Sequence, residues 1–374
     1  MGLGASGFLL IAACYGLARY SFGLFLPEIS ANLSLSPVLA GIIAGGSFAG
    51  YCMAILVATW LAERLGPRAV VALAGLIAGT GLLAMALSES APMLAASVLF
   101  AGLSTGLVSP PMVAAVEMSV NPQRRPIVNT VINAGTSGGV VLSGLAALAL
   151  GAHWRYAFAL FGVMSFAVTI PALFVTPKGG GRRAPPRRVT LSPGLVRLMA
   201  SAFLTGMVST AIWSFGAVMT TRSLGANGQA GLFWIVAGVS GAAGALAGSF
   251  TNRWGVNAAH RVFLVLTACS LAMVGLSSSA APALVGGAVF GTAYVMLTGI
   301  YLVWGIVEMP ERPAAGLTVG FLSIAVGQIV GAPLFGSLLD VVHTKDAAVI
   351  FAILALVTCL IRAPGRTSPQ PAPR

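Results

Sequence analysis

Residues 59–68 read Thr-Trp-Leu-Ala-Glu-Arg-Leu-Gly-Pro-Arg and hold three of the chain's few charged side chains. This polar stretch separates two long apolar runs, 37–60 and 68–87. A shortened copy, Asn252-Arg253-Trp254-Gly255, follows a third apolar run at 229–251. The stretch therefore predicts a tight turn between two helices, and its second copy indicates an internal repeat.

The composition around this turn is that of a membrane protein. Charged residues make up 7% of the 374 residues, whereas soluble domains carry about 25%. Hydrophobic residues make up 57%, and the mean hydropathy is +0.96. So few charges could not cover a soluble globule of this size, which excludes a soluble enzyme and a disordered chain.

Twelve apolar runs predict an all-α polytopic membrane protein. A hydrocarbon core of about 30 Å needs roughly 20 apolar residues in a helix. Lipid offers the backbone no hydrogen bonds, so each run is expected to be helical. The last run is the weakest because its apolar stretch is short. The runs are 6–27, 37–60, 68–87, 92–117, 127–150, 156–176, 195–219, 229–251, 261–279, 282–307, 315–339 and 346–363.

The basic residues predict the orientation. Sixteen of the twenty Lys and Arg residues fall in loops on one side, three fall on the other, and Arg19 lies inside the first run. Because Lys and Arg concentrate in cytoplasmic loops, we expect both termini to be cytoplasmic in a protein of the cell (inner) membrane. No Lys or Arg precedes Arg19, so the first run is expected to be a retained helix and not a cleaved signal peptide.

Four matches in order divide the chain into two similar halves. Residues 20–23 recur at 213–216, 63–66 at 252–255, 116–118 at 307–309 and 125–126 at 312–313. The predicted units are a six-helix bundle at 1–176, a basic cytoplasmic linker at 177–194, a second six-helix bundle at 195–363 and a disordered tail at 364–374. Two parallel six-helix repeats are typical of transporters whose binding site lies at the interface between the repeats.

Residues 59–68 resemble the signature of the major facilitator superfamily between its second and third helices, and His153-Trp154-Arg155 is also similar to that family. Thr59, Glu63 and Pro67 depart from the usual Gly, Asp and Arg. The resemblance implies twelve transmembrane helices in two pseudo-symmetric bundles and transport by alternating access. It also implies that the turn and its copy latch the two halves, although ordinary helix-end charges are the alternative. The latch residues would be Glu63, Arg64, Gly66, Arg68, Asn252, Arg253 and Gly255.

Arg19 is the first candidate for a binding residue. Pro27 follows eight residues later, so Arg19 falls about 12 Å inside the end of its run, near the bilayer midplane. Its charge predicts contact with an anionic substrate group, while an internal counter-ion, snorkelling to the interface or a structural hydrogen bond are the alternatives. The other predicted binding residues are polar or aromatic positions in other runs: Tyr15, Asn133, Trp213, Tyr294, Thr298 and Gln328.

The acidic, Cys and His residues limit the chemistry. None of the eight acids lies in the middle of a run, so Glu117 is a proton-coupling candidate by analogy with the family alone. The spacing of Cys and His supports neither a metal site nor a disulfide framework, and no catalytic residue or cofactor is predicted. The net charge of +12 is spread over short loops, so nucleic-acid binding is not expected.

These features predict a secondary transporter that acts as a monomer in the lipid bilayer on a small-molecule substrate. The glycines of the fifth run, among them Gly135, Gly139 and Gly144, loosely resemble the glycine-rich fifth-helix motif of exporters in the superfamily and so favour export, with ordinary tight packing as the alternative. Coupling of this export to protons is implied by the family resemblance alone. Uptake of a small organic anion bound through Arg19 is the first alternative. A membrane sensor or scaffold that transports nothing is the second.

Overall fold

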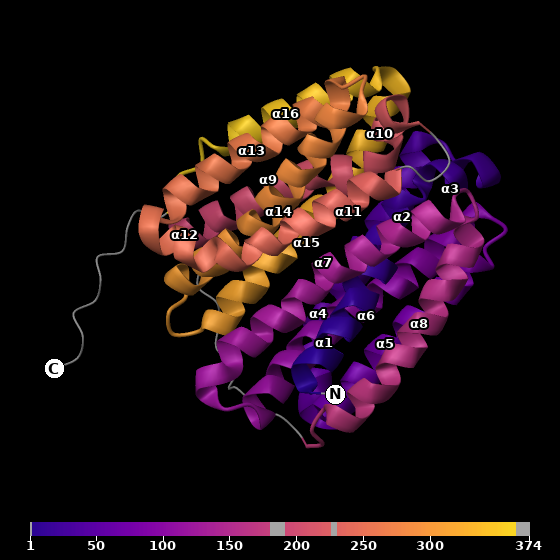
Figure 1. Cartoon of the computed structure of the whole chain (residues 1–374). Helices are drawn as coiled ribbons and strands as arrows, with labels where there is room; N and C mark the ends of the chain where they lie inside the picture. The colour runs from indigo at the N-terminus through magenta and orange to yellow at the C-terminus, as the bar shows by residue number, and fades with distance from the viewer. Residues whose placement is uncertain (1, 180–190, 226–229, 364–374) are drawn as a thin grey trace.

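A computed structural model describes residues 2–179, 191–225 and 230–363, and these segments are helical with short turns. Two helical bundles built from successive halves of the chain lie against each other (Figure 1). Most of the predicted linker and all of the predicted tail lie outside the described residues. The predicted all-α fold with two bundles is confirmed.

The first half has six spans, of which the first is irregular. α1 (Leu3–Ile11) continues as a π-helical segment, Ala12–Tyr20, and then as α2 (Ser21–Leu24) and α3 (Leu26–Leu33). A 3₁₀ turn, Pro122–Arg124, precedes the fifth span. The remaining spans are α4 (Pro37–Leu65), α5 (Pro67–Ala86), α6 (Ala91–Ser119), α7 (Arg125–Leu150) and α8 (Trp154–Val175).

The second half repeats this order. Proline opens α9 and α15, as it opens α4 and α5, because the first turn of a helix needs no donor from its N–H group. A 3₁₀ segment, Ala242–Leu246, interrupts the eighth span. The elements are α9 (Pro193–Trp213), α10 (Gly216–Leu224), α11 (Ala230–Gly241), α12 (Ala247–Trp254), α13 (Val256–Leu276), α14 (Ala280–Glu308), α15 (Pro313–Val341) and α16 (Thr344–Thr358).

Eleven helices in the described part of the chain are long and apolar enough to cross a membrane. The twelfth predicted run forms α16, which has 15 residues and is as short as the sequence indicates. α16 packs against α13 and α9, so it completes the second bundle. The twelve-run prediction therefore agrees with the structure, with one span shorter than the others.

The two copies of the polar turn adopt the same backbone conformation. Gly66 has φ +80° and ψ 156°, and Gly255 has φ +84° and ψ 156°. Side chains rarely tolerate this region, which explains why glycine stands at both positions. The internal repeat therefore extends to the backbone of the turns.

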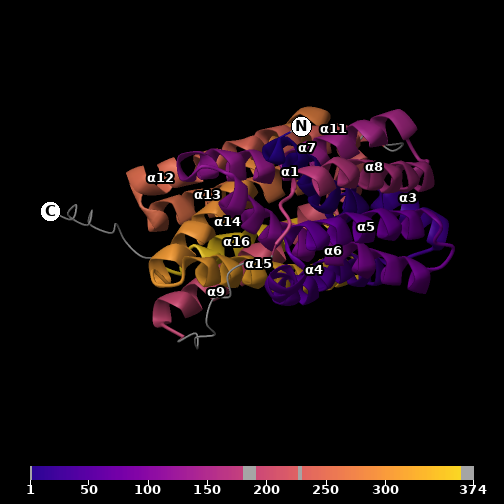
Figure 2. The same cartoon turned by 90° about the horizontal axis from the view of Figure 1, so that it is seen from below.

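The two halves meet along α4 with α15 and along α7 with α11. Figure 2 shows α7 beside α11. Glycines permit this approach: a Cβ on Gly41 would collide with the backbone of Ala332, and a Cβ on Gly144 would lie 2.6 Å from the carbonyl oxygen of Gly231. These contacts lie toward the end of the molecule that contains residues 34–36 and 225, which we call the far end.

The ribbons of the two halves diverge toward the opposite end, which we call the linker end (Figure 1). This end contains residues 66, 179 and 255, which follow α4, α8 and α12. On α7, Ser137 still contacts the second half, since a Cβ on Gly241 would lie 3.0 Å from its Oγ atom. Asn133, one turn closer to the linker end, is exposed. The contacts between the halves described here therefore lie toward the far end.

Candidate functional site

The first and seventh spans are both interrupted at the positions where their sequences match. The π-helical segment Ala12–Tyr20 ends at the start of residues 20–23, and α9 ends at Trp213, the first residue of the matching 213–216. Gly16 brings this segment against α7, because a Cβ on Gly16 would collide with the backbone of Gly139. π-Helical turns occur frequently at functional sites. This segment carries Tyr15 and Arg19.

Arg19 is buried, with 6% of its surface exposed. Its Nη2 atom donates a hydrogen bond of 2.8 Å to Oε1 of Gln328 on α15, and its Nε atom is buried without a partner. The guanidinium carbon lies 4.7–5.7 Å from the centres of four aromatic rings, and no carboxylate of the described residues contacts it. The rings are those of Tyr15, Tyr20, Phe48 and Tyr51.

Gln328 connects the first half to three spans of the second. Its Nε2 atom donates hydrogen bonds to Oγ of Ser209 on α9 (3.2 Å) and to Oη of Tyr294 on α14 (3.1 Å). The Gln328 side chain is fully buried. Of the predicted binding residues, the structure thus brings Arg19, Gln328 and Tyr294 into one hydrogen-bonded cluster.

Trp213 packs beside this cluster. Its ring centre lies 4.3 Å from that of Tyr20 and 5.5 Å from that of Tyr294. The indole is 6% exposed, and its Nε1 atom has no hydrogen-bond partner. Tyr15 is half-buried and shares a hydrogen bond of 2.8 Å with Ser109 of α6.

Two predicted binding residues lie outside the cluster. Asn133 is exposed on α7, and the half-buried Thr298 donates its hydroxyl to the Val295 carbonyl of its own helix at 2.7 Å. The predicted binding residues did not include Phe48 and Tyr51. They are aromatic residues one turn apart on α4, and inside an apolar run they give no signal that separates them from packing residues.

The predicted latch residues of the first half make contacts within that half. Arg68 donates from Nε to the Thr176 carbonyl at 2.6 Å, and Arg64 lies over the ring of Trp60 at 4.4 Å. Glu63 is half-buried. In the second half, Asn252 and Arg253 are exposed at the end of α12. The latch stays a prediction.

Glu117 is exposed at the linker end of α6, where its backbone carbonyl accepts a hydrogen bond of 2.7 Å from Arg125. Its counterpart in the repeat, Glu308, is half-buried and accepts hydrogen bonds from Ser192 (3.2 Å) and Trp304 (3.3 Å). Glu308 therefore lies at the positively polarised start of α9, where a carboxylate is stabilised. The proton-coupling role of Glu117 stays a prediction.

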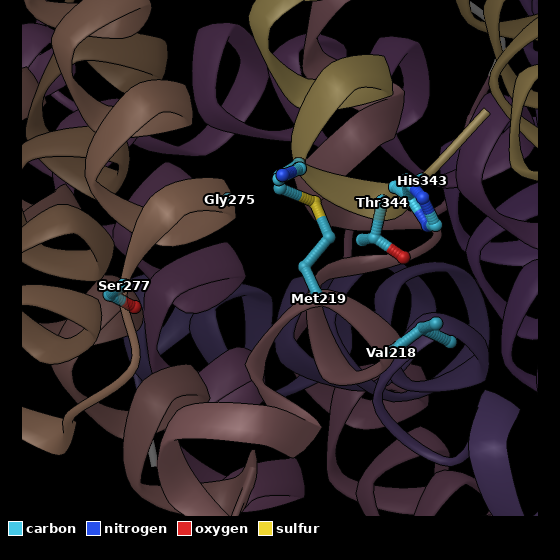
Figure 3. Close-up of a pocket in the computed structure, with 7 residues that line it drawn as sticks. Val218, Met219, Gly275, Ser277, His343 and Thr344 are labelled. Atoms are coloured by element: carbon cyan, nitrogen blue, oxygen red, sulfur yellow. The ribbon is translucent and has the colours of Figure 1, made fainter.

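A pocket of about 240 Å³ lies at the far end of the second half, away from Arg19. Its walls come from α10, the end of α13 with the turn after it, and the start of α16, with Met219, Gly275 and Thr344 among the lining residues (Figure 3). Another pocket of about 230 Å³ lies between the halves at the same end, beside Pro37 and Phe215. Neither contains a residue of the Arg19 cluster. In the described segments, no group of three or more His, Cys, Asp or Glu residues could hold a metal ion.

Comparison with known proteins places this architecture in a family. A family model described as Major Facilitator Superfamily matches residues 8–325. The chain belongs to this superfamily. The resemblance of residues 59–68 to the signature of the superfamily is thereby confirmed, and the chain is a membrane transporter of the superfamily.

Two curated superfamily relatives show what this chain resembles. It is 25% identical to human monocarboxylate transporter 11 over 379 residues, covering 93% of this chain and 78% of that protein. It is 26% identical over 231 residues to solute carrier family 2, facilitated glucose transporter member 10, of Mus musculus, covering 57% of this chain and 43% of that protein.

Solved structures share the superfamily fold at low sequence identity. The xylose transporter XylE from E. coli, in an inward open conformation, matches with a TM-score of 0.79 and 12% identity, covering 97% of this chain and 96% of that one. A bacterial homologue of the human lysosomal transporter Spinster matches with a TM-score of 0.77 and 16% identity, covering 95% and 94%. At these identities the likeness establishes the fold alone.

Proposed function

We propose that this transporter moves a small organic anion by alternating access, with Arg19 binding the carboxylate of the substrate. The observation that carries the proposal is the burial of a guanidinium between the two halves beside an amide and four aromatic rings, with no carboxylate of the described residues in contact. A second supporting feature is the buried, unpartnered Nε1–H of Trp213 in the same region.

Energetics favour an anionic ligand. An Arg at the bilayer centre costs about 2.5–3.5 kcal/mol on insertion scales. The neutral Gln328 amide and the rings of Phe48 and Tyr51 stabilise the guanidinium, yet they leave its positive charge in place. A substrate carboxylate would both neutralise the charge and supply charge-assisted hydrogen bonds.

The two curated relatives point to different substrates. The name of monocarboxylate transporter 11 refers to an organic anion, and the name of the glucose transporter refers to a neutral sugar. The Arg19 cluster supports the anionic class for this chain. We infer a small monocarboxylate, because the cluster offers one guanidinium surrounded by rings.

We propose that the linker end faces the cytoplasm and that the structure corresponds to an inward-open state. The excess of Lys and Arg in the loops of the linker end supports this orientation, with both termini cytoplasmic in the cell membrane. The packing of Gly41 and Gly144 supports closure of the far end. In the opposite state, the polar turns around Gly66 and Gly255 would meet and form the predicted latch. A single chain supplies both halves, so we propose a monomer.

Direction and coupling form the finer part of the proposal. Proton-coupled export, which the sequence favours, uses the same anion site as uptake. The glycines of α7 pack against α1 and α11, and either direction of transport needs that close packing. Glu117 is the proposed proton carrier. The alternative function, a membrane sensor or scaffold, predicts no substrate flux in either direction.

Transport by purified protein in liposomes tests these proposals. Labelled benzoate and lactate serve as anionic probes and labelled glucose as the neutral contrast, with and without an imposed pH gradient. We expect flux of a carboxylate but not of glucose. Arg19→Gln should lower carboxylate flux at least about tenfold, since it removes a charge-assisted pair, and Arg19→Lys should keep part of it.

The control is Arg197→Gln, which removes a cation from the exposed start of α9 and should leave flux unchanged. Equal carboxylate flux in Arg19→Gln and the unmodified protein would remove Arg19 from the site. Proton coupling through Glu117 would be contradicted if the carboxylate flux were the same with and without the pH gradient. It would also be contradicted if Glu117→Gln left the flux unchanged.

A further inference from the structure

Gln328 makes a hydrogen bond that joins the two halves at the Arg19 cluster. Its Oε1 atom accepts from Arg19 of the first half, while its Nε2 atom is held by Ser209 and Tyr294 of the second half. The amide group is fully buried. The position of the amide oxygen is thus fixed by two anchors that belong to the second half alone.

The chemistry of the guanidinium shows what this oxygen displaces. The Nε–H and one Nη2–H bond of an Arg side chain point in the same direction, and together they form an edge that matches the two oxygens of a carboxylate. In this structure Gln328 accepts from Nη2 at 2.8 Å, while Nε is buried and unpartnered. The amide oxygen therefore satisfies one nitrogen of the guanidinium, whereas the two oxygens of a carboxylate could satisfy both Nη2 and Nε.

We infer that Gln328 is an internal competitor of the substrate, and that the incoming carboxylate displaces its Oε1 atom from Arg19. Displacement removes the hydrogen bond between the first span and α15, while Ser209 and Tyr294 keep the amide with the second half. Substrate binding is thereby linked to release of a contact between the halves. Gln328 is a positioning residue in this scheme. The inference rests on the proposed anion site at Arg19.

Two substitutions at Gln328 are expected to change affinity in opposite directions. Gln328→Leu keeps the size of the side chain and removes the competing oxygen, so the Kd of labelled benzoate should fall several-fold. Gln328→Glu places a permanent carboxylate against Arg19, so the Kd should rise about tenfold or more. A side chain that only packs, or that binds substrate directly, would raise the Kd in both variants.

Ser209→Ala provides a second route to the same answer. It removes one anchor of the amide without touching Arg19, so Gln328 competes less well and the benzoate Kd should fall by a smaller factor. This variant decides the matter if Gln328→Leu does not yield a monodisperse protein. The matched control is Ser337→Ala, whose hydroxyl bonds to the Pro333 carbonyl of its own helix and which should leave the Kd unchanged.

The outcomes separate the two proposals. If the unmodified protein binds neither benzoate nor lactate, or if Arg19→Gln binds them equally well, the anion site itself is wrong. If binding depends on Arg19 but Gln328→Leu, Gln328→Glu and Ser209→Ala all weaken it, the competitor role is overturned while the anion site stands. A lower Kd in Gln328→Leu or Ser209→Ala, together with a higher Kd in Gln328→Glu, supports the inference.

Discussion

Tyr20 and Trp213 occupy equivalent positions in the two repeats, and their rings pack against each other with centres 4.3 Å apart. Three residues after Tyr20, Gly23 lies so close to the break in the seventh span that a Cβ there would collide with the carbonyl oxygen of Trp213. The internal repeat thus brings its own matching segments together across the boundary between the halves. This contact closes the far end directly beside Arg19.

Gly23→Ala should oppose this closure. The added methyl group meets backbone rather than a movable side chain, and overpacking of this kind costs about 1–3 kcal/mol. We expect carboxylate flux to fall roughly tenfold or more while the protein still folds. The control is Gly248→Ala on α12, where a Cβ meets nothing within 4 Å. Equal flux in both variants would show that the Gly23 contact is not needed for transport.

Trp213→Phe and Trp213→Ala should differ in thermal stability. Phe retains contact with Tyr20 and Phe290, whereas Ala leaves a cavity that costs about 3–5 kcal/mol in a protein core. We expect a clearly lower Tm in detergent for Trp213→Ala and a small decrease for Trp213→Phe. Similar Tm values for the two variants would mean that the rings around Trp213 add little to the packing of the far end.

Gly66→Ala and Gly255→Ala should destabilise the two polar turns to a similar extent. Both glycines have φ near +80°, a conformation that costs a residue with a side chain about 1–3 kcal/mol. A decrease in Tm of similar size in the two variants is expected, and Gly248→Ala serves as the reference. An unchanged Tm would show that the turns relax to another conformation.

Glu28 should make stability depend on pH. It lies in the first turn of α3, beyond the membrane-crossing segment Leu3–Leu24, and burial raises the pKa of its carboxyl above the ordinary 4.5. One of its oxygens is buried without a partner. The folded protein therefore binds a proton more tightly than the unfolded chain, so stability falls as pH rises through the raised pKa.

Glu28→Gln removes this dependence. Its Tm should match that of the unmodified protein below pH 4.5, exceed it increasingly as the pH rises from 4.5 to the raised pKa of Glu28, and exceed it by a constant amount at higher pH. Glu89→Gln changes an exposed acid between α5 and α6 and should leave the pH profile unchanged. A Tm difference that is the same at every pH would contradict the assignment to Glu28.

The fold could be predicted from the sequence because the sequence patterns that indicate it are local. Apolar runs of bilayer length predict the spans, and the repeat of residues 63–66 at 252–255 predicts two equivalent halves. The π-helical segment Ala12–Tyr20 was not predicted, and its close approach to Gly139 of another span through Gly16 is a tertiary contact that the sequence does not show. The weakness of the last run was visible in its length, and α16 is correspondingly short.

The sequence predicted single residues of the candidate site but not which of them lie together. Arg19 and Gln328 each stand out as polar residues in apolar runs, but they are 309 positions apart, and no pattern in the sequence pairs them. Asn133 looked equivalent to Gln328 in the sequence, yet it is exposed where the halves separate. Which polar residues converge is set by the packing of α4 on α15 and of α7 on α11, and this information is tertiary.

The hydrogen bond from Arg19 to Gln328 also bears on the step in which a carrier returns without cargo. If Arg19 had no ligand in the empty transporter, its uncompensated charge in the middle of the membrane would prevent the change of conformation until another anion bound. Such a transporter could only exchange one anion for another. The amide of Gln328, from the opposite half, gives Arg19 a substitute ligand while the empty transporter changes conformation. We therefore expect the unloaded protein to reorient on its own and to move its substrate in net amounts down a gradient.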